Sequence, residues 1–273
     1  MLSVMEGLEY CDIAFDDGQT LDPKTRIEYR KALGETLYKI PTTCEEFHAT
    51  FEPDLDGINA SPACDPPSLD ILSIGIRNMS TQLVRVSLDS LAISPSLFWP
   101  DDSEDATAPY WPRLKHFELR YEPSLASGER LAYLKQNDKT DIRPYSEKSP
   151  LLIEAYLGRP ALHCERANGL FVAVGRATRN MPALQEMRLE MFDELVSLLF
   201  TYKYEKEHMA FVASWHSTPS VFEASPDVLE AFGILEGSFV ERPSLSTSAE
   251  HRSPSVTTRG SIYQGLCSPA LTR

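Results

Sequence analysis

The sequence predicts an irregular α/β fold in which short strands form one sheet and helices or loops pack on its outer side. Two observations indicate it. The phrase at residues 111–119, Trp-Pro-Arg-Leu-Lys-His-Phe-Glu-Leu, recurs at 181–189 as Met-Pro-Ala-Leu-Gln-Glu-Met-Arg-Leu, and residues 40–49 contain a fainter copy. Two expected helices also end in the same tripeptide, Arg-Asn-Met. Strand-sized units that cannot bury their apolar side alone are typical of stacked repeats.

The chain is expected to begin with a strand and a helix. Residues 10–15 suit a short strand, and Asp16-Asp17-Gly18 is a turn signal that stops it. Asp22-Pro23 then provides a helix cap and the first helical turn. Pro41 ends this helix.

The next unit is a strand, a loop and a clear helix. Residues 47–51 alternate between apolar and polar side chains, as a strand does, and residues 52–67 are expected to be a loop. A helix with apolar residues on one face begins at Ser68. The strand after it fits two registers, one through Leu83, Val86 and Leu88, the other through Leu88, Leu91 and Ile93. We prefer the second, which leaves a longer helix before it.

The middle of the chain contains the two clear copies of the repeated phrase. Residues 101–110 are expected to be a loop and residues 111–121 a strand. Residues 122–150 are polar and are expected to leave the repeats with little local order. A helix over residues 168–180 and a strand over residues 184–191 follow.

The C-terminal part is expected to close the repeats. Residues 198–204 and 209–215 suit a hairpin, and residues 225–237 a capping helix that ends at a glycine. Residues 240–273, rich in Ser, Thr, Pro and Arg, are expected to be a disordered tail. The remainder, residues 1–239, is expected to form a single repeat-like domain.

Composition limits the class of protein. An apolar share of 42% and an aromatic share of 10% in 273 residues suit a globular domain. No run of 18 uncharged apolar residues predicts a membrane span, and the N-terminus does not resemble a signal peptide. The 5 cysteines contain no Cys-x-x-Cys pair, so neither a zinc site nor a disulfide framework is indicated. We expect a cytoplasmic or nuclear protein with reduced thiols.

The net charge of −14 limits the partners. Nucleic-acid binding requires clustered Lys and Arg, so we expect no nucleic-acid partner. The negative charge instead favours a basic protein partner.

No catalytic, cofactor-binding or metal-binding residue is predicted. Residues 52–57 imitate the start of a calcium loop, but the twelfth position is Ala63 instead of Glu. His163-Cys164 lacks an identifiable acid or base for thiol chemistry. His208 and His216 lack a third metal ligand.

Two aromatic residues and one acidic run are candidate binding elements. Trp99 and Trp111 each adjoin a proline at a strand boundary, and we expect both in the core. The acidic run at residues 101–105 is expected to be a solvated loop.

Several short motifs resemble the C-terminal region of fungal F-box proteins with degenerate leucine-rich-repeat-like domains. Between Pro41 and Gly237 they occur in the order Leu88-x-x-Leu91-x-Ile93, Phe98-Trp99-Pro100, Trp111-Pro112-x-Leu114, Ser127-Gly128, Met181-Pro182-x-Leu184 and Trp215. The resemblance implies a leucine-rich-repeat-like sheet and a substrate-recognition subunit of a ubiquitin ligase. Residues 1–40 contain no Leu-Pro-x-Glu opening of an F-box, so docking to the ligase adaptor is not expected.

The predicted function is a non-catalytic protein-interaction module. The alternatives are a small hydrolase with a site assembled from distant residues and an inactive product of a truncated gene. A deep pocket with paired titratable groups would favour the hydrolase, whereas a broad exposed sheet would favour binding.

Overall fold

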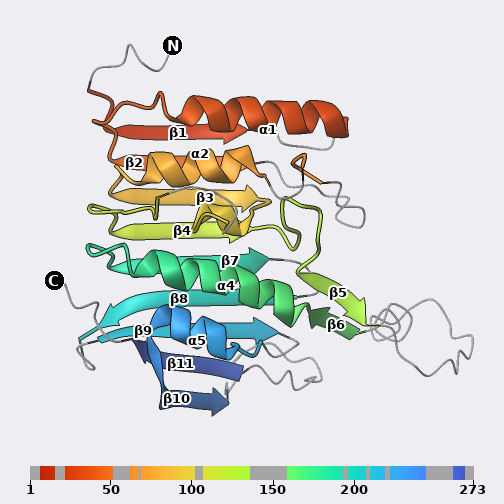
Figure 1. Cartoon of the computed structure of the whole chain (residues 1–273), viewed down its shortest axis with the longest axis vertical. Helices are drawn as coiled ribbons and strands as arrows, with labels where there is room; N and C mark the ends of the chain where they lie inside the picture. The colour runs from red at the N-terminus through yellow and green to blue at the C-terminus, as the bar shows by residue number, and fades with distance from the viewer. Residues whose placement is uncertain are drawn as a thin grey trace, which may run out of the picture.

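The computed structural model describes residues 7–15, 22–51, 62–66, 69–101, 107–135, 159–192, 196–206, 210–218, 222–243 and 261–267. These residues form one large sheet, a small two-stranded sheet and a layer of helices (Figure 1). The predicted α/β class, with short strands in one sheet and helices outside it, is confirmed.

The large sheet is parallel in its first half and antiparallel in its second. Its strands lie in the order β1-β2-β3-β4-β7-β8-β9-β11-β10. The parallel strands are Tyr10–Phe15 (β1), Glu46–Phe51 (β2), Arg85–Leu91 (β3), His116–Tyr121 (β4) and Glu186–Phe192 (β7). The antiparallel strands are Ser197–Glu205 (β8), Ala210–Thr218 (β9), Ser261–Cys267 (β11) and Ile234–Pro243 (β10).

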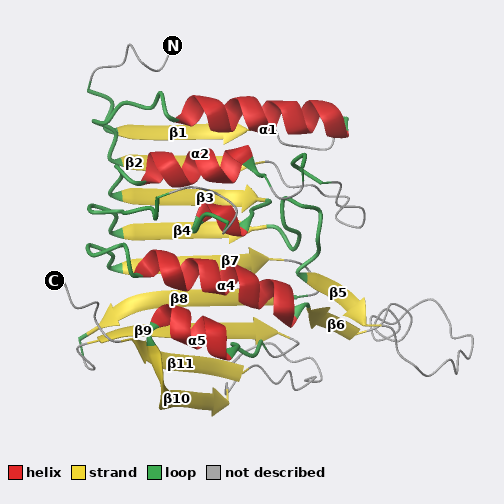
Figure 2. Cartoon of the chain, viewed as in Figure 1, coloured by secondary structure: helices red, strands yellow, loops and turns green. Residues whose placement is uncertain are grey.

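The helices lie together on one side of this sheet (Figure 2). They are Pro23–Leu37 (α1), Ile71–Ser80 (α2), Cys164–Thr178 (α4) and Pro226–Phe232 (α5), with a 3₁₀ turn at Pro95–Leu97 (η2). The small sheet pairs Ala132–Lys135 (β5) with Arg159–Leu162 (β6). The inward-pointing residues of β1, β2, β3, β4, β7, β8 and β9 meet the helices in one contiguous apolar core.

The repeated phrase corresponds to a repeated structure. Its first apolar position lies in the turn before the strand and is buried in four successive units, at Cys44, Leu83, Leu114 and Leu184. Its second and third apolar positions are also buried, and the register pairs Phe117 with Met187 and Leu119 with Leu189. Leu91 shares the same core as Phe117 and Met187. The short strands therefore share one hydrophobic core.

Backbone hydrogen bonds repeat with the same period. The N–H groups of Glu45 and Glu46 both donate to the carbonyl of Glu9, at 2.8 and 3.1 Å. The N–H groups of Val84 and Arg85 make the same pair of bonds to the carbonyl of Glu45. The pattern continues at the starts of β4 and β7. Each unit is thus aligned by hydrogen bonds to the unit before it.

Two glycines allow the first two helices to pack closely. Neighbouring strands are about 4.8 Å apart, whereas packed helices are usually about 8–10 Å apart. Gly34 of α1 and Gly75 of α2 face one another, and an added Cβ on Gly34 would lie 2.6 Å from the backbone carbonyl carbon of Ile71. In the described part of the next connection, the short η2 stands in place of a helix. Both features reduce the mismatch in spacing between the two layers.

An aromatic cluster closes the C-terminal part of the core. The fully buried Trp215 of β9 packs against Phe200 at 5.2 Å and against Phe232 of α5 at 5.6 Å between ring centroids. Phe171 of α4 and Phe222 complete the cluster. The predicted hairpin and capping helix are present as β8–β9 and α5.

The preferred register of the third strand is wrong. The strand begins at Arg85, so the rejected register through Val86 and Leu88 describes its first part. Ser90 has a φ of 58°, and the pairing with β4 shifts between Leu88 and Leu91. This bulge turns Leu88 and Leu91 to the same side, which is why the sequence fits both registers.

Two further boundaries differ from the prediction. The last helix ends at Gly233, whose φ of 70° is left-handed, and not at Gly237. Residues 122–135 are ordered around Leu125 and Ala126, which are buried, and continue into β5.

The expected disordered tail is corrected for residues 240–243 and 261–267. These segments belong to β10 and β11, and β11 pairs with β9 and β10 on its two sides. The physical reason is that β9 would otherwise present a row of unpaired peptide groups at the sheet edge. The rest of the tail lies outside the described residues.

Candidate functional site

The side of the parallel strands that faces away from the helices is the candidate site, and we call it the open face. Residues on β1, β2, β3, β4 and β7 alternate between buried and solvent-accessible positions, and the accessible ones point away from the helix layer. Parallel sheets are usually covered on both sides. Here one side is polar and uncovered by any described residue.

Register places these polar residues in rows that cross the strands. One row contains Tyr10, Glu46, Arg85, His116, Glu186 and Lys203. The next row contains Asp12, His48, Ser87, Glu118, Arg188 and Thr201. A third row begins with Ala14, Thr50 and Asp89. Because neighbouring strands are about 4.8 Å apart, each row spans several side chains within reach of one extended ligand.

Three ion pairs connect the strands or lie along them. Arg85 Nε lies 3.6 Å from Glu46 Oε1, and Arg120 Nη1 lies 3.3 Å from Asp89 Oδ1. Arg188 Nη2 lies 2.8 Å from an oxygen of Glu190 within β7. All are partly exposed, and such pairs stabilise a fold by about 0–1 kcal/mol each. Their main effect is to fix the directions of the charged groups.

The open face has an excess of negative charge. On the parallel strands it has three arginines, which the ion pairs engage, and six carboxylates at Asp12, Glu46, Asp89, Glu118, Glu186 and Glu190. Asp12, Glu118 and Glu186 lie outside these three ion pairs. Asp12 and Glu118 are in the same row, three strands or about 14 Å apart.

Two histidines lie among these charges. The ring of His48 packs against Tyr10 with centroids 5.1 Å apart. Partial burial, and after it the positive charge of Arg85, lower the pKa of His116. The neutral form of His116 is therefore favoured, and its ring adds a polar but uncharged group to the row.

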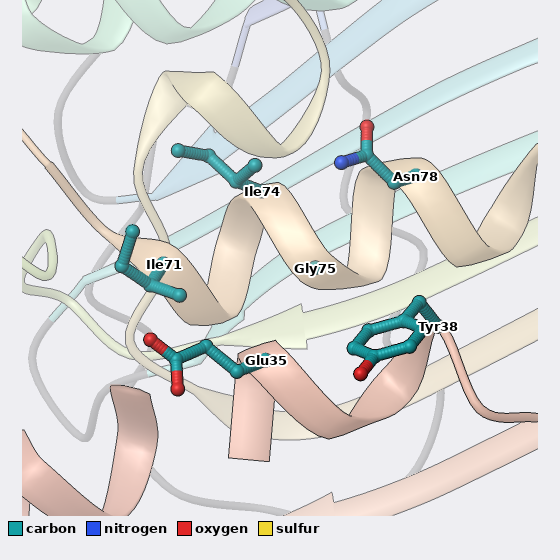
Figure 3. A pocket seen from close by; sticks show the side chains of 7 residues that line it. Glu35, Tyr38, Ile71, Ile74, Gly75 and Asn78 are labelled. Carbon is teal, nitrogen blue, oxygen red and sulfur yellow. The ribbon is translucent and has the colours of Figure 1, made fainter. Parts of the chain in front are cut away.

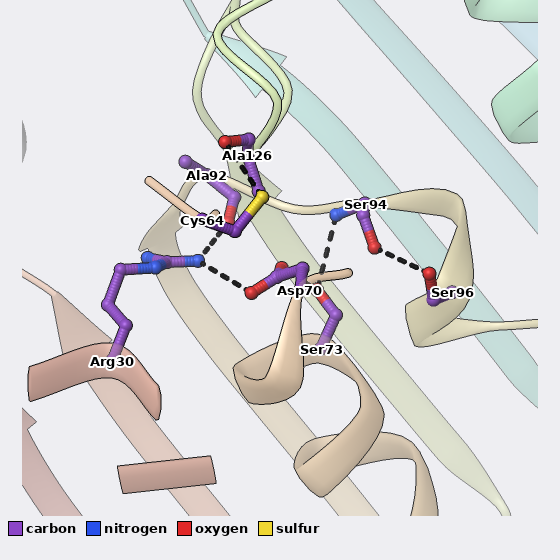
Figure 4. Close-up of polar contacts among 8 residues, drawn as sticks. All are labelled: Arg30, Cys64, Asp70, Ser73, Ala92, Ser94, Ser96 and Ala126. Carbon is purple, nitrogen blue, oxygen red and sulfur yellow. Dashed lines mark hydrogen bonds and ion pairs between the residues drawn. The ribbon is translucent and has the colours of Figure 1, made fainter. Parts of the chain in front are cut away.

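A second polar cluster lies inside the helix layer (Figure 4). The guanidinium of Arg30 donates to the carbonyl of Ala92 at 2.8 Å and lies 3.6 Å from the carboxylate of Asp70. Ser73 donates to Asp70 and accepts from the N–H of Ser94. Arg30 and Asp70 are each only 1% exposed. This cluster connects α1, α2 and the segment after β3, and its burial makes it a structural brace.

Cys64 adjoins this brace. Its thiol lies 3.3 Å from the carbonyl of Ala126. Burial, and after it the charge of Asp70, raise the pKa of Cys64 to about 11. A thiol with this pKa is protonated at neutral pH and is a poor nucleophile.

The helix layer also has two shallow hollows. One, of about 280 Å³, lies above the crossing of α1 and α2 and is lined by Glu35, Tyr38, Ile71, Ile74 and Asn78 with the two glycines (Figure 3). The other, of about 320 Å³, lies between η2, α4 and the segment near Ser127, and Trp99, Asp101, Glu129 and Arg176 are on its walls. Neither hollow is lined by a histidine or a cysteine.

The structure places the candidate residues of the sequence in different environments. Trp111 is in the core, as expected, and its Nε1 donates to Ser80 at 2.8 Å, while Trp99 is only partly buried. His163 stacks on Tyr133 at 4.1 Å. Cys164 begins α4. The calcium-like segment, His208 and most of the acidic run lie outside the described residues.

The residues of the open face were not identified from the sequence. The signal was present, because the polar positions inside each repeated phrase are the accessible ones. In the copy at residues 181–189 these positions are Glu186 and Arg188, and in the copy at 111–119 they are His116 and Glu118. The apolar positions of the phrase predict the fold, whereas the polar positions between them form the open face.

Comparisons with known proteins give a family without a known role. The model of a family of unknown function, DUF6546, matches residues 79–269, which is more than half of the chain. No curated protein and no solved structure matches. In the part of the chain that the structure describes, no three His, Cys, Asp or Glu side chains are grouped as metal ligands would be. No described helix has the length and apolar character needed to span a bilayer.

Proposed function

We propose that this chain, which belongs to the DUF6546 family, is a non-catalytic protein-recognition module that binds its partner on the open face. The observation that supports this best is the set of polar rows on a sheet side that no described residue covers. Repeat proteins commonly use such broad, rigid surfaces for binding. A surface without a deep cleft suits another macromolecule better than a small substrate.

The charge of the open face favours a basic partner. Six carboxylates and three arginines leave the face acidic, in agreement with the net charge of −14. Opposite charges accelerate association and set specificity more than they increase affinity. The three carboxylates outside the ion pairs are the ones most available to the partner's Lys and Arg.

The hydrolase alternative has less support. A hydrolytic site needs a nucleophile within hydrogen-bond distance of a base, with both in a concave site. The two hollows offer serines and carboxylates but no histidine or cysteine. The buried Ser73 and Asp70 lie within the core, where no substrate reaches them.

A matched pair of charge reversals tests the proposal. Glu118→Lys with Glu186→Lys reverses two carboxylates of the open face. Glu28→Lys with Glu35→Lys makes the same change on the exposed outer side of α1. Affinity capture from the native cells should recover a protein with the wild type and with the α1 variant, and lose it with the open-face variant. Equal recovery by all three proteins, or no reproducible partner, would contradict the proposal.

The motif order that resembles fungal F-box proteins suggests a more specific role. In that case the partner is a substrate of a ubiquitin ligase. The experiment is to test whether the ligase adaptor co-purifies with the chain. If the adaptor is absent while the basic partner is captured, the ligase role is refuted and the recognition role remains.

A further inference from the structure

Among the residues that the structure describes, the first strand of the sheet has an unpaired outer edge. Strand β1 pairs with β2 on one side, and no described residue pairs with it on the other. The N–H of Glu46 donates to the carbonyl of Glu9. By the alternation of a parallel ladder, the peptide groups of Tyr10, Asp12 and Ala14 therefore point to the outer edge. Their donors and acceptors are available to an additional strand.

Apolar residues of this first unit are less covered than their equivalents. Leu8 corresponds to Cys44 and Leu114, which are fully buried, but Leu8 itself is only partly buried. Ile13 is likewise partly buried, whereas Leu119, its equivalent in β4, is 0% exposed. In the described residues, β1 is therefore the outermost strand of the repeats, and the apolar side chains of this unit are incompletely covered. In repeat proteins such an end is normally covered by a further unit or a cap.

We propose that the outer edge of β1 binds an extended segment of a basic protein partner as an additional parallel strand. Continuing the ladder gives the segment's pattern. Apolar residues at alternate positions would cover Ile13 on the helix side, and an apolar residue before the alternating part would cover Leu8, which lies three residues before Cys11. The residues between them would lie on the open side next to Tyr10 and Asp12, where a Lys or Arg would meet the Asp12 carboxylate. This is the geometry of β-strand addition, in which main-chain bonds give affinity and alternate side chains give specificity.

Charge excludes a second copy of this chain as the preferred occupant. A β1 strand from another copy would bring two edges that each have Glu9 and Asp12 close together, in proteins that each have a net charge of −14. Like charges on adjacent strands are destabilising. A basic segment has the opposite effect. The inference concerns the edge alone and holds whether or not the open face binds a partner.

A short peptide is the probe. It has valine at alternate positions and lysine between them, and its control has the same composition with the lysines and valines in separate blocks. Fluorescence anisotropy should show binding of the alternating peptide and not of the block peptide. Equal binding of the two, or no binding of either, would overturn the proposal.

N-methylation of the probe tests the hydrogen bonds without altering the protein. The carbonyl of Glu9 points to β2, so by alternation the peptide groups of the inward-pointing Cys11 and Ile13 also bond to β2. An earlier strand in the ladder thus bonds to the next one through its core-facing residues. N-methylation of the valines should therefore weaken binding by about tenfold or more, because several main-chain bonds are lost. N-methylation of the lysines should have little effect. The reverse result would refute the parallel register.

A proline variant tests the same edge from the protein side. Asp12→Pro removes an N–H group that points to the outer edge. The N–H of Ile13 points to β2, so Ile13 is not substituted. The variant should keep its cooperative unfolding transition and lose the peptide. Glu118→Lys with Glu186→Lys, on the open face, should bind the peptide as the wild type does. Concentration-dependent dimerisation that Asp12→Pro abolishes would show a second copy on the edge and would overturn the proposal.

Discussion

The crossing of α1 and α2 gives the sharpest test of how this fold is held together. At Gly34 an added Cβ would lie 2.6 Å from the carbonyl carbon of Ile71 and 2.8 Å from the Cα of Leu72. At Gly75 it would lie 2.8 Å from the Cα of Gly34. Carbon atoms in ordinary contact are about 3.5–4.0 Å apart, so Gly34→Ala or Gly75→Ala must move one helix by about 1 Å.

The expected cost follows from two opposing effects. The neighbouring atoms are backbone, which cannot rotate away, and overpacking of this kind costs about 1–3 kcal/mol or more. Alanine in place of glycine in a helix recovers about 1 kcal/mol. We expect each variant to lower the free energy of unfolding by about 0–2 kcal/mol, near the upper end because the neighbouring atoms are backbone. The double variant should cost less than the sum of both, because helices that are already separated accommodate the second methyl group.

Gly169 provides the matched control. It lies within α4, and an added Cβ would meet no atom within 4 Å. Gly169→Ala should therefore stabilise the protein by about 0.5–1 kcal/mol through helix propensity alone. Urea unfolding followed by circular dichroism measures all of these changes. If Gly34→Ala proves as stable as Gly169→Ala, the argument that the helices meet at backbone distance is refuted.

Two further predictions concern buried polar groups. Arg30→Met should destabilise the protein by about 3–5 kcal/mol in urea unfolding, because it leaves the Asp70 carboxylate buried without its cation. Arg120→Met removes a partly exposed ion pair and should cost less than about 1 kcal/mol. Equal costs would contradict the structural role of the buried pair. For Cys64, the folded pKa of about 11 exceeds the unfolded value of 9.0, so between these pH values the unfolded chain releases a proton that the folded chain keeps. The free energy of unfolding should therefore fall as pH rises from about 9 to about 11. Cys64→Ala should reduce this loss of stability. An unchanged pH dependence in the variant would show that the thiol is not buried in the folded state.

Local signals in the sequence were sufficient to predict most elements. Asp22-Pro23 begins α1 as expected, with the Asp22 carboxylate accepting from the N–H groups of Lys24 and Thr25. The repeated phrase located β4 and β7 and also predicted that their apolar residues share one core. These predictions succeeded because capping and strand alternation depend on residues a few positions apart. The candidate site was recoverable from the same phrases, at their polar positions.

The errors share a physical cause. The bulge at Ser90 depends on how β3 fits against β4, and β11 forms a strand by pairing with β9, far earlier in the chain. The hairpin of β5 and β6 likewise joins segments that are distant in sequence. Pairing energy between such segments is absent from any local window, so propensity and periodicity do not detect it.

The sequence by itself determined the class of fold, the repeated unit, the acidic charge and the alternation that makes one side of each strand polar. Only the tertiary structure decided that these polar sides join into rows on an uncovered face, that Gly34 and Gly75 meet, and that Arg30 and Asp70 are buried together. Alternation and charge are properties of neighbouring residues, whereas register, helix crossing and a buried ion pair arise when segments tens of residues apart pack against one another.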